Sequence, residues 1–261
     1  MKHFARKRFG QNFLHDPNVI NRIITTIDPN PDQHLVEIGP GLGALTRELL
    51  PIVHAMDAIE LDRDLVPKLE HACASLGKLT VHSADALKFD FSQLVKHDEK
   101  LRIIGNLPYN ISTPLMFHLF DQMQVIEDMH FMLQKEVVDR IVSSPGSNSY
   151  GRLSVMVQYY CKPMKLFAIG AGAFNPQPKV ESAIVRLLPY DKQVFKANDE
   201  KAFARLVNQA FSKRRKTIRN CMKDTLSTEQ LENLGIDSGL RPEMLSLEQF
   251  VLMSNMAGNS A

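Results

Sequence analysis

The chain has 261 residues, of which 44% are hydrophobic and 23% are charged, and its formal net charge is only +2. A chain of this length can form one large domain, or a large domain with a small second one. No segment has the apolar core of a signal peptide, and none approaches the roughly 18 uninterrupted apolar residues of a membrane span. We therefore expect a soluble, cytoplasmic protein with no membrane partner.

The cysteines and histidines do not indicate a metal centre. Cys73, Cys161 and Cys221 lie far apart, and the sequence contains no Cys-x-x-Cys pair. A zinc site or a redox dithiol would need closely spaced thiols. The nine histidines are dispersed as well. We expect no metal ion and a reducing compartment.

The first predicted element is a helix that begins after Asp16-Pro17. Aspartate is a preferred N-cap residue, and proline is favoured at the first helical position. Apolar residues then recur at helical spacing, at Val19, Ile20, Ile23, Ile24 and Ile27. Pro29 and Pro31 end the pattern.

Strand and helix patterns alternate over the next hundred residues. The predicted strands cover residues 34–39, 54–61, 79–84, 101–106 and 129–134. The predicted helices cover residues 45–53, 63–74, 114–122 and 135–142. Such alternation is typical of an α/β fold whose parallel sheet has helices on both faces.

The last third of the chain changes character. A loop at 143–151 precedes a helix at 153–160 and two strands at 164–170 and 182–188, which we expect to be antiparallel near the sheet edge. From residue 198 every pattern is helical, with capping-box spacing at Ser227/Gln230 and Ser246/Gln249. We predict a first domain over 1–191 and a small all-α domain over 192–261.

A glycine-rich segment, EIGPGLGA from Glu37 to Ala44, lies at the end of the strand predicted at 34–39 and opens the helix predicted at 45–53. Gly39 and Gly41 suit a tight turn that approaches a ligand closely, and the helix beyond supplies free backbone N–H groups. The motif is ambiguous by itself, because Gly39, Gly41 and Ala44 also satisfy the dinucleotide-binding pattern.

Three acids end consecutive predicted strands: Glu37, Glu60 and Asp85. Glu60 follows the glycines by about 20 residues, where an acid accepts both hydroxyls of a ribose. Asp85 has the position to bond the exocyclic amine of an adenine, although taken alone it fits an ordinary helix cap better. Together the acids line the crevice where open α/β sheets hold ligands.

The segment NLPYNIS, from Asn106 to Ser112, follows the fourth strand directly. Asparagine and proline favour turns in any context. A polar residue, proline and an aromatic at a strand end, beside the expected ligand crevice, also form a motif of the Asn/Asp-Pro-Pro-Tyr type. We interpret Asn106, Pro108 and Tyr109 as catalytic residues.

Basic residues gather in two segments that contain no acid. The first holds Lys2, Arg6, Lys7 and Arg8, and the second holds Arg205, Lys213, Arg214, Arg215, Lys216, Arg219 and Lys223. A charge run is often only a solvated helix face. A face without acids over about five helical turns favours phosphate binding.

These motifs, in this order and spacing, closely resemble the KsgA (RsmA) family of small-subunit ribosomal RNA adenine N6,N6-dimethyltransferases. The resemblance covers nearly the whole chain. It rests on FGQNFL at 9–14, EIGPGLGALT at 37–46, Glu60, Asp85, NLPYNIST at 106–113, LQKEV at 133–137, FNPQPKVESAIVRL at 174–187 and AFSKRRKTIRN at 210–220.

The resemblance implies a Rossmann-like methyltransferase domain that uses S-adenosyl-L-methionine, and a helical C-terminal domain that binds RNA. The implied cofactor contacts are Asn12, Leu14, Gly39, Gly41, Glu60, Asp85 and Asn106. Asn106, Pro108 and Tyr109 would hold the target adenine, with Phe174 as a second aromatic wall. The implied RNA contacts are Lys2, Arg6, Lys7, Arg8, Lys213, Arg214, Arg215, Lys216 and Arg219.

The implied substrate is a 3′-terminal hairpin loop of 16S ribosomal RNA in the immature small subunit, where two adjacent adenosines become N6,N6-dimethyladenosine. The by-product is S-adenosyl-L-homocysteine. We expect the segment from Phe9 to Leu14 to fold over the cofactor, and a monomeric protein that acts in ribosome biogenesis.

Three other interpretations stay open at this point. A large-subunit adenine methyltransferase of the Erm type shares the cofactor motifs and Asn106 to Tyr109. A non-catalytic ribosome-assembly factor could retain the same fold. A nicotinamide-dependent oxidoreductase is permitted by Gly39, Gly41 and Ala44, but would explain neither NLPY nor the basic segments.

Overall fold

The computed structural model describes residues 11–96, 99–213 and 215–258. The chain divides into two compact units, and each is described by itself. The first unit extends to Val138 and resumes from Met164 to Pro189, whereas the second comprises Asp139–Pro163 and continues from Tyr190.

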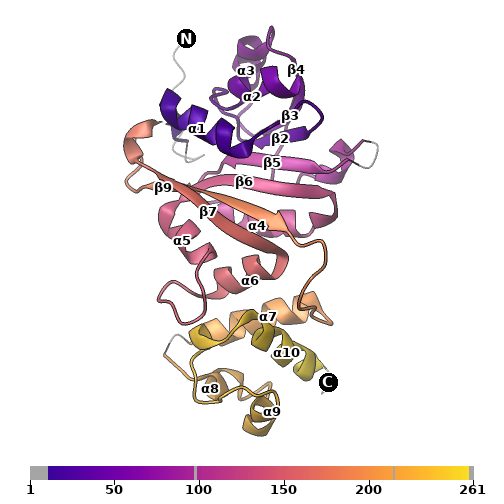
Figure 1. The fold of residues 1–261 in the computed structure, drawn as a ribbon, viewed down its shortest axis with the longest axis vertical. Coiled ribbons are helices and arrows are strands. Elements are labelled where there is room, and N and C mark those ends of the chain that lie inside the picture. Colours follow the sequence, from indigo (N-terminus) through magenta and orange to yellow (C-terminus); the bar gives the residue numbers. More distant parts are fainter. Residues whose placement is uncertain (1–10, 97–98, 214, 259–261) are drawn as a thin grey trace. The chain divides into compact units, whose positions relative to one another are not determined.

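A seven-stranded sheet of order β4-β3-β2-β5-β6-β9-β7 forms the first unit (Figure 1). Its strands are β2 (His34–Ile38), β3 (Ala55–Glu60), β4 (Lys78–Ser83), β5 (Leu101–Asn106), β6 (Ile126–Gln134), β7 (Cys161–Ile169) and β9 (Ser182–Pro189). The strands from β2 to β6 pair in parallel, and β9 is antiparallel to β6. The predicted α/β, Rossmann-like fold is confirmed.

Helices cover the sheet. They are α1 (Pro17–Ile27), α2 (Thr46–Val53), α3 (Val66–Cys73) and α4 (Ser112–Phe120), with 3₁₀ turns η2 (Phe91–Leu94), η3 (Met123–Val125) and η4 (Ala171–Ala173). The predicted N-cap of α1 is confirmed, because the Asp16 carboxylate accepts hydrogen bonds from the backbone N–H groups of Asn18 and Val19.

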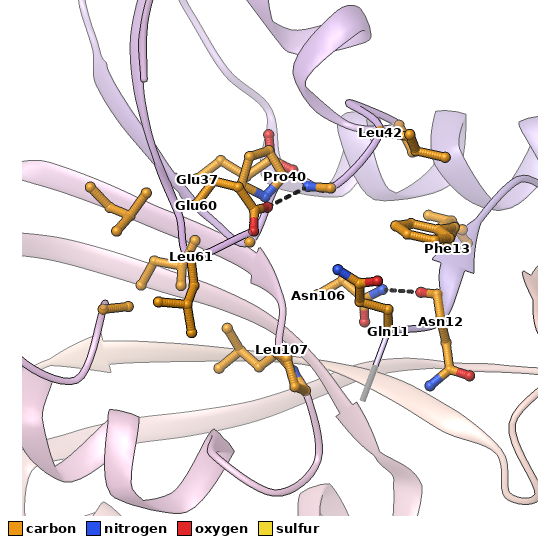
Figure 2. Close-up of a pocket in the computed structure, with 18 of the residues that line it drawn as sticks. Gln11, Asn12, Phe13, Glu37, Pro40, Leu42, Glu60, Leu61, Asn106 and Leu107 are labelled. Carbon is orange, nitrogen blue, oxygen red and sulfur yellow. Dashed lines mark hydrogen bonds between the residues drawn. The ribbon is translucent and has the colours of Figure 1, made fainter. Parts of the chain in front are cut away.

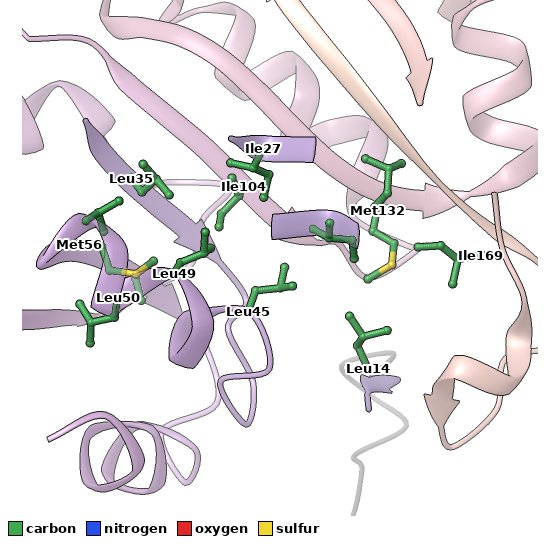
Figure 3. Packing of buried hydrophobic residues seen from close by; sticks show 14 of the residues in the cluster. Leu14, Ile27, Leu35, Leu45, Leu49, Leu50, Met56, Ile104, Met132 and Ile169 are labelled. Atoms are coloured by element: carbon green, nitrogen blue, oxygen red, sulfur yellow. The ribbon is translucent and has the colours of Figure 1, made fainter. Parts of the chain in front are cut away.

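Both faces of the sheet are buried. Leu35, Ile104 and Met132 pack with apolar residues of α1 and α2, among them Ile27 and Leu49 (Figure 3). The side chains that point to the other face of the same strands are equally inaccessible to solvent, namely Val36, Ile103 and Phe131. Burial on both faces explains why these strands are nearly continuous apolar runs.

The strand order reverses at β2, with β3 on one side and β5 on the other. The connections that follow the adjacent strands β2 and β5 therefore leave their carboxyl ends in opposite directions, which opens a crevice there. A small ribbon of β1 (Phe13–Leu14) and β8 (Phe174–Asn175) is antiparallel and separate from the main sheet.

The second unit is helical, and α5 (Lys135–Ile141) leads into it. Its other elements are α6 (Arg152–Tyr160), α7 (Glu200–Phe211), α8 (Ile218–Met222), α9 (Thr228–Asn233), η5 (Pro242–Met244) and α10 (Leu247–Gly258). Helix α7 packs against α6, α8 and α10. The ring centroids of Tyr159 and Phe203 lie 4.5 Å apart in this core. Both predicted capping boxes, at Ser227 and Ser246, are present.

The predicted domain division at 191/192 stays a proposal. The compact units differ from it in that residues 139–163 group with the C-terminal helices. None of the helices in the described ranges is long and apolar enough to cross a membrane.

One expectation about the second unit was wrong. The acid-free segment does not form a continuous helix, since α7 ends at Phe211 and α8 begins at Ile218. Like charges that lie three residues apart on a helix, as Lys213 and Lys216 would, repel each other and disfavour a continuous helix there. Lys213, Arg215 and Lys216 therefore lie in the connection, and Arg219 lies in α8.

Candidate active site

A cavity of about 540 Å³ opens at the carboxyl ends of β2, β3 and β5 (Figure 2). Its walls come from the glycine-rich turn, the residues after β3, β4 and β5, and the segment before α1. A cavity of this size is in the usual range for cofactors and drug-sized molecules. It lies at the crevice that the topology predicts.

Gly39 and Gly41 form the turn over this cavity, with φ angles of 67° and 60°. Such positive φ values favour glycine. A Cβ on Gly41 would also lie 3.2 Å from the ring of Phe13, a tighter contact than about nine in ten Cβ atoms make. Glycine is therefore favoured at position 41 by its backbone conformation and by its neighbour.

The Glu60 carboxylate is 6% exposed and accepts hydrogen bonds from the backbone N–H groups of Gly41 and Asp62, at 3.1 and 2.8 Å. Burial raises the pKa of Glu60, and these two bonds oppose the rise. They also hold the carboxylate against the glycine-rich turn, at the edge of the cavity (Figure 2).

Asp85 lines the cavity, and its Oδ1 accepts a hydrogen bond from the N–H of Leu87 at 3.0 Å. The capping and the ligand-binding interpretations of this residue are compatible, because a carboxylate has more acceptor sites than one turn uses. Among the lining residues within the described ranges there is no lysine or arginine.

Glu37 is the most buried acid of the cavity, at 2% exposure. The Thr46 hydroxyl donates to its Oε2 at 2.6 Å. Burial raises the pKa of Glu37 to about 7, the Thr46 bond opposes this rise, and the nearby Glu60 adds to it.

The segment before α1 forms one wall of the cavity. Asn12 and Leu14 line it, as sequence analysis predicts, together with Gln11 and Phe13. Strand β1 is held there by its pairing with β8, which joins Phe13 to Asn175 and Leu14 to Phe174. Residues 11–14 thus lie beside the cavity, residues 9 and 10 lie outside the described residues, and closure of the segment over a cofactor stays a prediction.

Asn106 ends β5 and lines the cavity. Its side-chain NH₂ donates to the backbone carbonyl of Asn12 at 3.0 Å (Figure 2). Because a carbonyl can only accept, this bond determines which end of the amide is nitrogen. No described residue donates to the amide oxygen, which leaves that oxygen as an acceptor for a ligand.

Pro108 and Tyr109 line the cavity beside Asn106. The Pro108 carbonyl accepts one hydrogen bond from the N–H of Ile111 at 3.1 Å, and its second lone pair remains. The Tyr109 hydroxyl is 3.0 Å from the hydroxyl of Ser182 on β9. That bond limits rotation of the ring.

Phe174 is not brought into the cavity. Its side chain is 3% exposed and packs in the apolar core with Leu14, while Asn175 lines the cavity instead. Its role as a second aromatic wall stays a prediction.

Four of the basic residues predicted to bind RNA are described, and they belong to the second unit. Lys213, Arg215, Lys216 and Arg219 are exposed in the second unit. The others, Lys2, Arg6, Lys7, Arg8 and Arg214, lie outside the described residues.

The residues that support the site were not predicted from the sequence. Ser182 anchors Tyr109, Thr46 bonds Glu37, and the Gln11 amide donates to Asp62 at 3.2 Å. Ser182 and Thr46 both fall inside segments that carry the family resemblance, but nothing in their spacing identifies a partner.

Comparison with known proteins gives a consistent result. Residues 2–258 match the family described as ribosomal RNA adenine dimethylase. The ribosomal RNA small subunit methyltransferase A of Marinobacter nauticus is 54% identical over 258 residues, covering 99% of this chain and 93% of that protein. The protein of the same name from Shewanella oneidensis is 56% identical over 254 residues, covering 97% and 95%.

Solved structures agree. A dimethyladenosine transferase from Plasmodium falciparum has a TM-score of 0.79 at 26% identity, covering 92% of this chain and 95% of that chain. The 23S rRNA methyltransferase ErmE has a TM-score of 0.74 at 24% identity, covering 95% and 100%, a likeness that shows the fold alone. By its family match and its full-length relatives, this chain belongs to the ribosomal RNA adenine dimethylase family.

Proposed function

We propose that this protein transfers methyl groups from S-adenosylmethionine to N6 of two adjacent adenosines in a 3′-terminal hairpin loop of 16S ribosomal RNA. The product is N6,N6-dimethyladenosine in the immature small subunit. Family membership and the names of relatives that span nearly their whole length support this reaction. The observation that carries it is the Asn106 amide, which lines the cavity and donates its NH₂ to Asn12, so that its oxygen is left to accept from a ligand.

The residues of the cavity fit the cofactor. Glu60 is positioned to accept ribose hydroxyls, Asp85 to accept from the adenine amine, and Gly39 and Gly41 to let the ligand approach the backbone. The bound cofactor supplies an activated methyl group on a sulfonium. With such an electrophile, the protein needs neither a strong base nor a metal ion of its own.

Asn106 and Pro108 activate the nucleophile. An adenine amine is a poor nucleophile, because its lone pair is delocalised into the ring. The Asn106 amide oxygen and the Pro108 carbonyl each accept one N6 hydrogen, which favours a pyramidal nitrogen with its lone pair directed at the donor. Both dipoles are fixed in advance and stabilise the positive charge that develops on nitrogen.

Tyr109 receives the base. A nucleobase must leave its stack to enter such a cavity, and stacking on an aromatic ring recovers about 1–3 kcal/mol per base. The bond to Ser182 orients the Tyr109 ring before the base arrives. In the second transfer only one N6 hydrogen remains, so one of the two acceptors loses its partner.

The exposed basic residues of the second unit, Lys213, Arg215, Lys216 and Arg219, support a role in phosphate binding. With Lys2, Arg6, Lys7, Arg8 and Arg214 they form the proposed RNA contacts. Ribosomal RNA as substrate also supports a cytoplasmic location, and we propose that the enzyme acts as a monomer.

The function is tested by incubating the protein with S-adenosylmethionine and small ribosomal subunits that lack the modification. Mass spectrometry of nuclease fragments would then locate any added methyl groups. We expect two adjacent dimethylated adenosines near the 3′ end of 16S RNA. Methylation of 23S RNA instead, or of neither RNA, would contradict the proposal.

A further inference from the structure

The strand-end cavity has an unusual charge balance. Three carboxylates line it, those of Glu37, Glu60 and Asp85, without a lysine or arginine among the described lining residues. His15 contributes an imidazole. A cavity of this kind favours cationic ligands over neutral ones of the same shape, and burial strengthens that preference.

Glu37 has fewer hydrogen-bond donors than its neighbour. Glu60 receives two backbone N–H groups, whereas the Thr46 hydroxyl is the single donor to Glu37 within the described chain. The two acids lie on the same face of the sheet, since Glu37 pairs in register with Ala58 and Glu60 lies two residues further along β3. A carboxylate this buried is costly to ionise unless a positive charge or more donors reach it.

We propose that Glu37 senses the charge of the cofactor: it holds a proton while the cavity is empty and releases that proton when cationic S-adenosylmethionine binds. The inference rests on the proposed function for the identity of the ligand. The donor has one more positive charge than S-adenosylhomocysteine, because the sulfonium becomes a neutral thioether when the methyl group leaves. Ionised Glu37 therefore makes the cavity favour the donor over the spent product.

The groups that face Glu37 determine the direction of the pH dependence. Burial raises the pKa of Glu37 to about 7, and the Glu60 charge acts in the same direction. Burial and Glu37 raise the pKa of the Cys73 thiol on α3, while Arg47 opposes this, so the thiol stays neutral. A bound cation stabilises the ionised form of Glu37 and lowers its pKa. Binding then releases a proton below about pH 7 and releases none well above it.

Isothermal titration calorimetry measures this release directly, from the dependence of the binding enthalpy on the ionisation enthalpy of the buffer. At about pH 6, S-adenosylmethionine should release between about half and one proton, and S-adenosylhomocysteine should release less. At about pH 8 neither should release any. The Kd for the donor should fall with rising pH, by up to about tenfold per pH unit below pH 7, and then level off.

Three variants identify the residue. Glu37→Gln should abolish proton release and make the Kd for the donor independent of pH. Glu48→Gln, the same change at an exposed position on the neighbouring α2, should behave as wild type. His15→Gln should retain the release, which separates Glu37 from the imidazole that shares the cavity.

A fourth variant keeps the test independent of whether Glu37→Gln folds. Because the Thr46 hydroxyl lowers the pKa of Glu37, Thr46→Val should extend proton release to higher pH. Binding of the donor to wild type without proton release at about pH 6 would overturn the inference alone. Equal release by wild type and Glu37→Gln, or its loss in His15→Gln, would do the same. Failure of wild type to bind either ligand would overturn the proposed function as well.

Discussion

Glu37 and Asp57 lie on neighbouring strands but on opposite faces of the sheet, and their surroundings differ. Burial would raise the pKa of Asp57, but hydrogen bonds from His34 and His82, at 2.7 and 2.6 Å, lower it instead. Glu37 has one hydroxyl donor, and its pKa rises. A carboxylate whose oxygen lone pairs are all hydrogen-bonded within the protein supports the fold. One whose lone pairs remain unused in a cavity is available to bind a ligand.

Asp128 is a second satisfied carboxylate, and it gives the largest expected effect on stability. It is fully buried between Arg102 and Arg186, with nitrogen–oxygen distances of 2.8 to 3.1 Å. Arg102 also donates to the carbonyls of Ile27 and Asp28 at the end of α1.

Asp128→Ala should lower the free energy of unfolding by about 3–5 kcal/mol, because it leaves the buried Arg102 charge without its partner. Urea unfolding measures this loss, with the exposed Asp32→Ala as the matched control. Activity per folded molecule should persist. A destabilisation below about 1 kcal/mol would show that this network does not support the sheet.

The basic segment can be tested without disturbing either kind of carboxylate. Arg215→Ala with Lys216→Ala should weaken RNA binding and reduce the slope of log Kd against log salt by up to roughly 0.7–0.9 per lost phosphate contact. The pair Lys78→Ala with Lys201→Ala, also exposed, is the control. An unchanged slope would contradict phosphate binding and indicate that these residues belong to an ordinary solvated surface.

Ser182→Ala removes the partner of the Tyr109 hydroxyl at the edge of the site without removing a charge. Loss of one hydrogen bond of about 0.5–1.5 kcal/mol predicts a KM for RNA raised a few-fold, with the Kd for the cofactor unchanged. Ser182→Thr, which retains a hydroxyl, should recover most of the effect. Equal KM values for wild type and the alanine variant would rule out the anchoring role.

A second effect on stability, smaller than that of Asp128, concerns His34, which lies between Asp57 and Glu99 at 2.7 and 2.8 Å. Both ring nitrogens face carboxylates, which requires the protonated imidazole. The hydrogen bond with Asp57 raises the pKa of His34; burial opposes this, and Glu99 adds to it. The stabilisation is fully present below the unfolded pKa of about 6.5 and is lost as pH rises through the higher folded pKa.

The contribution of Asp57 to stability depends on pH in the opposite direction. It is present above the unfolded pKa of about 3.8 and is lost as pH falls through the lower folded value. The two contributions overlap between about pH 4 and 6.5, where His34→Gln should cost on the order of 1 kcal/mol. Thermal unfolding across pH measures this window, with the exposed His71→Gln as control. A penalty that grows above neutral pH would contradict the assignment.

The sequence predicts the local features of this molecule well. Strand β5 matches its expected bounds, and the Asp16 cap follows from short-range patterns. Glu60 and Asn106 reach one cavity because parallel strands end at the same edge. Features that depend on distant partners are missed: Tyr109 and Ser182 are 73 residues apart, and Arg102 and Asp128 are 26 apart.

Phe174 illustrates the same limit. An aromatic residue in a segment that carries the family resemblance fits a stacking role, but in the structure the ring of Phe174 packs in the apolar core. The break between α7 and α8 was not predicted either, although Lys213 and Lys216 would repel each other three residues apart on a continuous helix. Helical periodicity alone does not locate the break between α7 and α8.

The proposed methyl transfer depends most on the Asn106 amide, and Asn106→Ala separates the role of this amide in chemistry from any role in binding. We predict that methyl transfer to unmodified small subunits falls by about 10²–10³-fold, while the Kd for S-adenosylmethionine changes by only a few-fold. Transfer at near wild-type rates, or a loss of cofactor binding as large as the loss of transfer, would contradict the claim.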